Sequence, residues 1–103
     1  MRQSAGLEAL KANAAEAADF LTLLANDKRL LILCELLQAG EMSVGALADA
    51  VDLSPSALSQ HLARLRADGI VETRRESQTI HYRLARDPRV TRTLSLLKRL
   101  FCA

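Results

Sequence analysis

The sequence predicts a mainly α-helical domain that carries one β-hairpin, with the element order α-α-α-α-β-β-α. Apolar residues recur at helical spacing over most of the 103 residues, and after Gly69 the period changes from 3.6 to 2. Serine, asparagine, aspartate and glycine stand where helix caps are expected. Hydrophobic residues make up 50% of the chain and aromatic residues only 3%. We therefore expect a single domain, residues 1–103, with an aliphatic core.

Two helices are predicted at the start of the chain, over residues 4–25 and 28–39. The first is rich in alanine and leucine, and its apolar residues recur at helical spacing: Leu7, Leu10, Ala14, Ala17, Leu21 and Leu24. Asn26 and Asp27 supply the cap of the second helix, which ends at Gly40. Because leucine and isoleucine leave this second helix almost no polar face, we expect it to be the central, buried helix.

A short helix and a tight connection come next. Ser43 is a good N-cap for a helix over residues 44–51, because its hydroxyl can accept a hydrogen bond from a backbone N–H that the helix leaves unpaired. Asp52 and Leu53 then lead into another helix over residues 54–69. A short helix, a turn and a second helix with small polar residues at its start are typical of a helix-turn-helix.

The helix over residues 54–69 has marked ends and two different faces. Ser54 is a good N-cap, Pro55 stands at the first helical position, and Gly69 can take the left-handed conformation that ends a helix. One face is an apolar stripe of Leu58, Leu62 and Leu65. The opposite face carries small and amide side chains, which suits the major groove of DNA and equally suits an ordinary solvent-exposed helix. On the DNA interpretation, the contacts predicted on this helix are Ser54, Ser56, Ser59, Gln60, His61, Arg64 and Arg66.

The hairpin and the last helix complete the chain. Strands are predicted over residues 70–75 and 79–84, joined by residues 76–78. Asp87 caps a last helix that begins at Pro88, with an apolar stripe of Val90, Leu94, Leu97 and Phe101. The whole order is that of a winged helix-turn-helix with an extra helix at each end. The DNA contacts predicted on the hairpin are Arg74, Arg75, His81 and Arg83.

The apolar stripes of the two terminal helices predict a partner subunit. A domain of this size buries only a modest share of its surface, so long apolar stripes at both ends favour further burial against a second copy. We expect a homodimer whose interface is formed by the N-terminal and C-terminal helices.

The charge distribution favours nucleic acid as a partner. The formal net charge is only +2. Residues 1–59, however, carry four Lys and Arg against eight Asp and Glu, a net charge of −4, and residues 60–103 carry ten against four, a net charge of +6. The basic part contains the candidate reading helix and the hairpin, as expected of a face that binds double-stranded DNA.

Several function classes are not expected. No stretch approaches the roughly 18 consecutive apolar residues of a membrane helix, and the N-terminus has no secretory leader pattern. The protein should therefore be cytoplasmic, with Cys34 and Cys102 as thiols. The sequence has no nucleophile–base pairing, no phosphate-cradling glycine loop and no cofactor motif, so we expect neither an enzyme nor a bound cofactor.

The chain resembles the ArsR/SmtB family of bacterial repressors from about Leu24 to the C-terminus. The resemblance rests on LANDKRLLIL (24–33), on LADAVDLSPSALSQHLARLRADGIV (47–71) and on the wing RRESQTIHYRL (74–84). It implies a symmetric dimer that binds an inverted-repeat operator. Many members sense metals, but the usual ligand positions here hold Ser43, Val44 and Gly45 instead of thiolates, and the last helix offers no good ligand set beyond Asp87. We expect no metal site at either usual position.

Two cysteines are left as candidate sensors. Cys34 in the second helix and Cys102 at the end of the last helix resemble the pair in the sulfide- and persulfide-responsive branch of the family. That resemblance implies a dithiol repressor that leaves DNA when reactive sulfur species bridge the two cysteines. Each cysteine alone also fits a structural role, because free cysteine is a common core residue.

Two alternatives stay open at the level of sequence. One keeps DNA binding and changes the input to a metal at an unusual site, or to no ligand. The other is of a different class, a winged-helix module for protein–protein contact.

Overall fold

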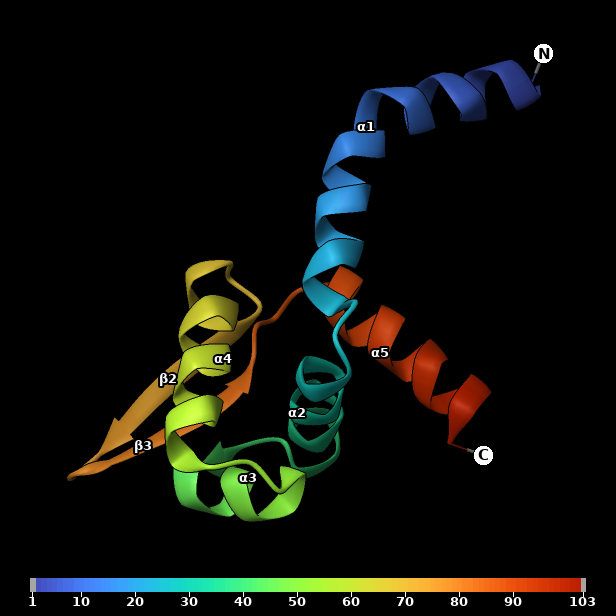
Figure 1. Cartoon of the computed structure of the whole chain (residues 1–103). Helices are drawn as coiled ribbons and strands as arrows, with labels where there is room; N and C mark the ends of the chain where they lie inside the picture. Colours follow the sequence, from blue (N-terminus) through green and yellow to red (C-terminus); the bar gives the residue numbers. More distant parts are fainter. Residues whose placement is uncertain (1, 103) are drawn as a thin grey trace.

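A computed structural model describes residues 2–102, which form five helices and a small sheet whose hairpin projects to one side (Figure 1). The helices are α1 (Arg2–Leu24), α2 (Asp27–Ala39), α3 (Val44–Val51), α4 (Pro55–Ala67) and α5 (Pro88–Phe101). The strands are β1 (Met42–Ser43), β2 (Val71–Glu76) and β3 (Thr79–Leu84). The predicted winged helix-turn-helix with an extra helix at each end is confirmed.

The predicted caps explain where the helices begin and end. Side-chain oxygens of Asn26, Ser43, Ser54 and Asp87 each accept a hydrogen bond from a first-turn backbone N–H at 2.9–3.2 Å. A cap of this kind stabilises a helix by about 1 kcal/mol. At the other ends, Gly40 and Gly69 have φ values of +86° and +73°, where a residue without Cβ is favoured.

The core connects the helix-turn-helix to the terminal helices. The fully buried side chains are Ile32, Leu33, Leu36, Leu47, Leu58, Leu62, Leu65, Val90 and Leu94. Helix α2 is central, as predicted, and packs against α3, α5 and β3. The prediction that α2 is buried on almost all sides is wrong for Leu31, which is 48% exposed, because the neighbouring elements cover only part of the helix surface.

The sheet has one strand more than predicted. Strand β1 pairs antiparallel with β3, and the strand order is β1-β3-β2. It was missed because two residues are too short to display an alternating pattern. Strand β2 begins and ends one residue later than predicted, since Ser77 has a φ of +56° and makes a two-residue turn with Gln78.

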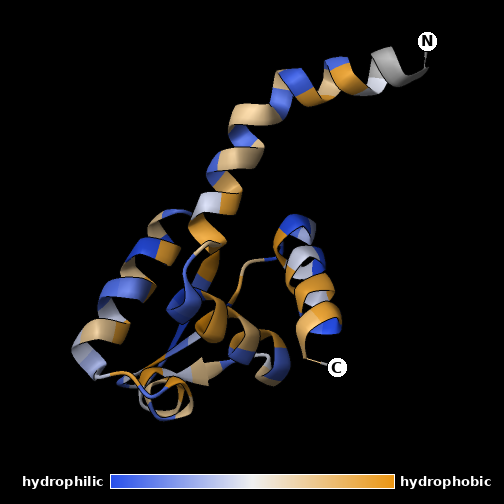
Figure 2. Cartoon of the chain, turned by 45° about the vertical axis from the view of Figure 1, so that its right-hand side comes forward, coloured by the Kyte–Doolittle hydropathy of each residue, from blue (hydrophilic) through white to orange (hydrophobic). Residues whose placement is uncertain are grey.

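Apolar side chains remain uncovered on both terminal helices. Helix α1 runs away from the rest of the chain, and apolar residues recur along both α1 and α5 (Figure 2). The exposed large apolar side chains on these two helices are Leu7, Leu10, Leu21, Leu96, Leu100 and Phe101. Patches of this kind are typical of protein–protein contact.

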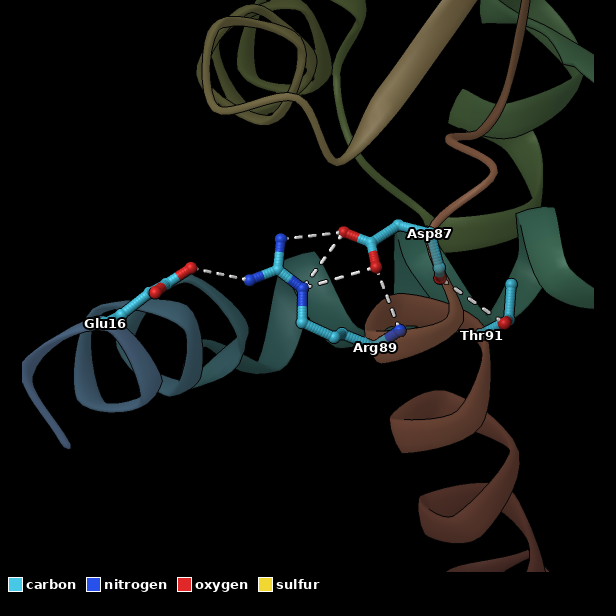
Figure 3. Close-up of polar contacts among 4 residues, drawn as sticks. All are labelled: Glu16, Asp87, Arg89 and Thr91. Atoms are coloured by element: carbon cyan, nitrogen blue, oxygen red, sulfur yellow. Dashed lines mark hydrogen bonds and ion pairs between the residues drawn. The ribbon is translucent and has the colours of Figure 1, made fainter. Parts of the chain in front are cut away.

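Arg89 at the start of α5 connects that helix to α1 through Glu16 (Figure 3). Its guanidinium lies 3.0 Å from a Glu16 carboxylate oxygen and 2.9 Å from Asp87. It also lies 5.7 Å from the centroid of the Phe20 ring, within the range of a cation–π contact. Hydrogen bonds from Arg89 lower the pKa of the Asp87 carboxyl. Because Arg89 and Glu16 are largely exposed, this ion pair adds little to stability.

Replacing a leucine of the α4 stripe should destabilise the whole domain. We expect Leu62→Ala, at a fully buried position, to lower the free energy of unfolding by about 2–5 kcal/mol through lost burial and a cavity. Gln60→Ala on the exposed face of the same helix should change it by less than about 0.5 kcal/mol. Urea unfolding of both variants at one protein concentration measures the difference, and similar losses for the two would contradict the assigned faces of α4.

Candidate DNA-binding face and cysteine pair

The outward face of α4 is the first part of the candidate DNA interface. Leu58, Leu62 and Leu65 are buried against the core, which turns the opposite face of the helix to solvent. The predicted base-edge residues Ser56, Ser59 and Gln60 are exposed, and His61 is half-buried at the edge of the stripe. The Ser54 hydroxyl accepts a hydrogen bond from the Ala57 N–H at 3.1 Å, so it acts as a cap in the free chain.

The two arginines at the end of α4 differ in their surroundings. Arg64 pairs with Asp68 one turn later, at 2.8 Å. Arg66 is exposed, and no ion pair involves it among the side chains that the structure describes. Both lie in the last turn, where cations are favourable for the helix dipole. Arg66 is therefore the cation on this helix that can meet a phosphate without giving up a carboxylate.

The wing hairpin has two chemically different faces. Residues directly opposite in an antiparallel pair point to the same side of the sheet. The register of β2 and β3 therefore places Val71, Thr73, Arg75, Ile80, Tyr82 and Leu84 on one face, and Glu72, Arg74, Glu76, Thr79, His81 and Arg83 on the other. The first face begins in the core, with Val71 buried. The second face is ionic, and it includes the 3.2 Å pair between Arg83 and Glu72.

Arg74 is held by two carboxylates on this ionic face. Its Nη2 lies 2.6 Å from Oε1 of Glu41, its Nε donates to both Glu41 oxygens at 3.1 and 3.2 Å, and its Nη1 lies 2.7 Å from Glu76. Hydrogen bonds from Arg74 lower the pKa of both carboxyls, and these carboxylates raise the pKa of Arg74. Both carboxylates therefore stay charged at neutral pH, and the contact is lost only as the pH falls below the ordinary glutamate range.

Arg75 has no such partners. It is exposed on the other face of β2, near the tip of the wing. Within the described residues no hydrogen bond or ion pair holds its guanidinium. The two adjacent arginines, which the sequence suggested as a pair of DNA contacts, thus lie in different environments. The DNA contacts on the hairpin remain predictions. Arg75, which has no carboxylate partner among the described residues, is the wing arginine that is available for a DNA contact.

The cysteines lie in α2 and directly after α5, two helices that pack together. Cys34 is half-buried in α2, where it contacts the edge of the core, and Cys102 is exposed at the C-cap of α5. Both are free thiols. Burial raises the pKa of the Cys34 thiol, the neighbouring Cys102 raises it further, and Lys98 opposes the shift. Because α2 and α5 pack together, Cys102 and Lys98 lie close enough to Cys34 to influence its pKa.

Two other features that would bear on function are a metal site and a membrane-spanning helix. No group of three or more His, Cys, Asp or Glu side chains within residues 2–102 is arranged to hold a metal ion. None of the helices in that range is long and apolar enough to cross a membrane.

Glu41 is the functional candidate that sequence reasoning missed. It lies just before β1, far from Arg74 in the sequence, and pattern analysis gave no reason to join them. One signal was available, because strict alternation along a strand places neighbouring arginines on opposite faces. That signal separates Arg74 from Arg75 without identifying the partner of either.

Comparisons with known proteins agree with this architecture. The family model described as "Bacterial regulatory protein, arsR family" matches residues 26–73. The chain is 49% identical to the transcriptional activator HlyU of Vibrio cholerae over 96 aligned residues. The aligned region covers 93% of this chain and 87% of that protein. It is 45% identical over 97 residues to the biofilm growth-associated repressor of Agrobacterium fabrum, and the aligned region covers 94% of this chain and 81% of that protein.

Solved structures show the same fold. Reduced HlyU from Vibrio cholerae superposes with a TM-score of 0.85 at 48% identity, covering 93% of this chain and 99% of that one. The homodimeric winged helix-turn-helix DNA-binding domain Mb0332 from Mycobacterium bovis, described as a possible ArsR-family regulator, gives a TM-score of 0.71. Its identity is 35%, and the match covers 88% of this chain and 82% of that one.

The two thiols should differ in reactivity. We expect iodoacetamide to alkylate Cys102 severalfold faster than Cys34 in the folded, reduced protein, because Cys34 is half-buried and its pKa is raised. Peptide mass spectrometry over a time course measures both rates. In denaturant the two rates should converge, which serves as the control. Equal rates in the folded protein would contradict the assigned environments.

Proposed function

Because the chain belongs to the arsR family of bacterial regulatory proteins, and is thus a transcriptional regulator, we propose that it represses transcription as a homodimer and leaves DNA when reactive sulfur species bridge Cys34 and Cys102. Its partners are double-stranded operator DNA, a second copy of the chain and a small sulfur oxidant. As a DNA regulator of a bacterium it acts in the cytoplasm. The observation that carries the switch is the placement of two free thiols, one in α2 and one at the C-cap of α5, on helices that pack together.

DNA binding is assigned to α4 and the wing. Helix α4 enters the major groove with Ser56, Ser59, Gln60 and His61 at or near base edges. This fits the exposure of the two serines and Gln60 opposite the buried leucines, with His61 half-buried at the edge of that face. Arg66 and Arg75 neutralise phosphates, since both are exposed and unpaired in the described residues. The remaining predicted contacts are Ser54, Arg64, His81 and Arg83. Arg74 is left out because two carboxylates already hold it.

The dimer is assigned to α1 and α5. Both helices expose leucines that no element of the same chain covers. An open hollow between them is lined by apolar groups of Ala17, Phe20, Leu21 and Pro88, which extends the apolar surface. A two-fold axis through this surface would present two α4 helices at successive turns of DNA, about 34 Å apart.

The sulfur step uses an organic persulfide as oxidant. The exposed Cys102 thiolate attacks the outer sulfur of the persulfide, the rest of which leaves as a thiol, and Cys102 becomes a persulfide. The Cys34 thiolate then attacks the inner sulfur and hydrogen sulfide departs. The two thiols have lost two electrons to the sulfane sulfur and are joined by a disulfide; a second persulfide would add one sulfur to the bridge.

The bridge changes DNA binding through the dimer. It ties the exposed end of α5 to α2, and α5 is one of the two helices assigned to the interface. A small shift there changes the separation of the two α4 helices, and only the correct separation fits an inverted-repeat operator.

A persulfide should bridge the cysteines and release DNA. We expect the intact mass of the reduced protein to show two thiols lost per chain after treatment, without covalent dimers, and its affinity for a duplex selected from a random library to fall. Cys34→Ser should keep its DNA affinity after the same treatment. If the wild-type mass is unchanged and both thiols still alkylate, the sulfur switch is wrong and DNA binding stands independently.

Salt dependence separates DNA binding from the alternative of a protein–protein module. A dimer that neutralises several phosphates should lose affinity for the selected duplex steeply with salt, with a slope of about −0.9 per phosphate contact. Arg75→Gln should lower the magnitude of that slope by about one for each wing in contact. Failure to select any duplex, or a flat salt dependence, would favour the module. Zinc or arsenite as additives in the same assay test a metal as the input.

A further inference from the structure

Among the described side chains from α2 to β3, Arg74 and Glu41 form the side-chain hydrogen bonds that span the most residues, 33. Glu41 lies immediately before β1, β1 pairs only with β3, and Arg74 lies on β2 at the far side of β3. Ser43, His81 and Arg74 stand in one row across the three strands. The guanidinium therefore crosses the middle strand to reach Glu41, which joins one edge of the sheet to the other.

The connection reaches the helix-turn-helix directly. Ser43, two residues after Glu41, is the N-cap of α3, and its hydroxyl accepts a hydrogen bond from the Ala46 N–H at 3.2 Å. Helix α3 packs against α4. A wing that is tied to Glu41 is thus oriented relative to both helices of the DNA-binding unit.

The same geometry makes Arg74 a poor phosphate ligand. Glu41 occupies its Nε and Nη2, and Glu76 occupies Nη1. Around the Arg74 guanidinium itself, Glu41 and Glu76 set two carboxylates against one cation, a local balance that does not attract a phosphate. A phosphate would have to compete with a bidentate carboxylate, which is one of the strongest partners for a guanidinium.

We infer that Arg74 and Glu41 are positioning residues that hold the wing in place so that Arg75 can contact DNA. This inference rests on the proposed assignment of DNA binding to α4 and the wing. The two adjacent arginines then have complementary roles, because Arg74 fixes the hairpin from its ionic face and Arg75 meets DNA from the other. Without the Arg74–Glu41 ion pair, the hairpin becomes ordered only when DNA binds, and the free-energy cost of that ordering lowers the affinity for DNA.

A double-mutant cycle between Glu41 and Arg75 tests the inference, because these residues lie on different faces and act together only through the wing. We expect Glu41→Gln to weaken binding of the selected duplex by about three- to tenfold, the scale of ordering one or two long side chains. In the Arg75→Gln background the same change should have little effect. Asp49→Asn, which removes one exposed carboxylate from α3, controls for the loss of negative charge and should not weaken binding. Thermal melting of each variant confirms folding.

The opposite outcomes are distinct. If Arg74 is itself a phosphate ligand that Glu41 restrains, Glu41→Gln will tighten binding and increase the salt slope by about one per wing. If Glu41 contributes only to general stability, Glu41→Gln will weaken binding by the same factor in the wild-type and Arg75→Gln backgrounds. Either result overturns the inference. A wild-type protein that binds no duplex contradicts the proposed function instead.

Discussion

The burial of the α4 leucine stripe is the constraint on which the rest of the structure depends. Leu58, Leu62 and Leu65 are fully buried in a core shared with α2 and α3. Because a helix cannot rotate once such a stripe is packed, the identity of its outer face is determined by its inner one. The hairpin follows directly, since Gly69 ends α4 in a left-handed conformation and Ile70 and Val71 enter the same core. The candidate reading face and the wing are therefore both consequences of how this one stripe is packed.

The fold was largely predictable because its signals are local. Caps such as Asn26 and Asp87, the glycines after α2 and α4, and the change of period after Gly69 each depend on a few neighbouring residues. Strand β1 was not predictable, since its two residues are a strand only through pairing with β3. The predicted burial of α2 fails at Leu31 for a related reason. Burial of a side chain depends on which other elements pack against it, and the composition of a helix does not reveal this.

The candidate site was less predictable because its contacts are long-range. The sequence identified Arg74 and Arg75 as basic residues on a hairpin, but the carboxylate that separates their environments comes from Glu41, before β1. Similarly, the approach of Cys102 to Cys34, close enough to influence its pKa, follows from the packing of α5 on α2. Resemblance to a family suggested that pair, and no spacing rule could have done so. Local patterns reveal which residues are available, whereas tertiary packing decides which of them meet.

The packing also indicates which part of the molecule a bridge between the cysteines would move. Helix α5 is anchored at its start, where Val90 and Leu94 are fully buried and Arg89 contacts α1. Its other end, which carries Cys102, is exposed. Cys34 lies on α2, in the same core as α4. Since a close-packed core resists deformation, a new bond between these positions should displace the free end of α5 and leave α4 intact. On the proposed switch, the signal therefore acts on the spacing of two unchanged reading helices.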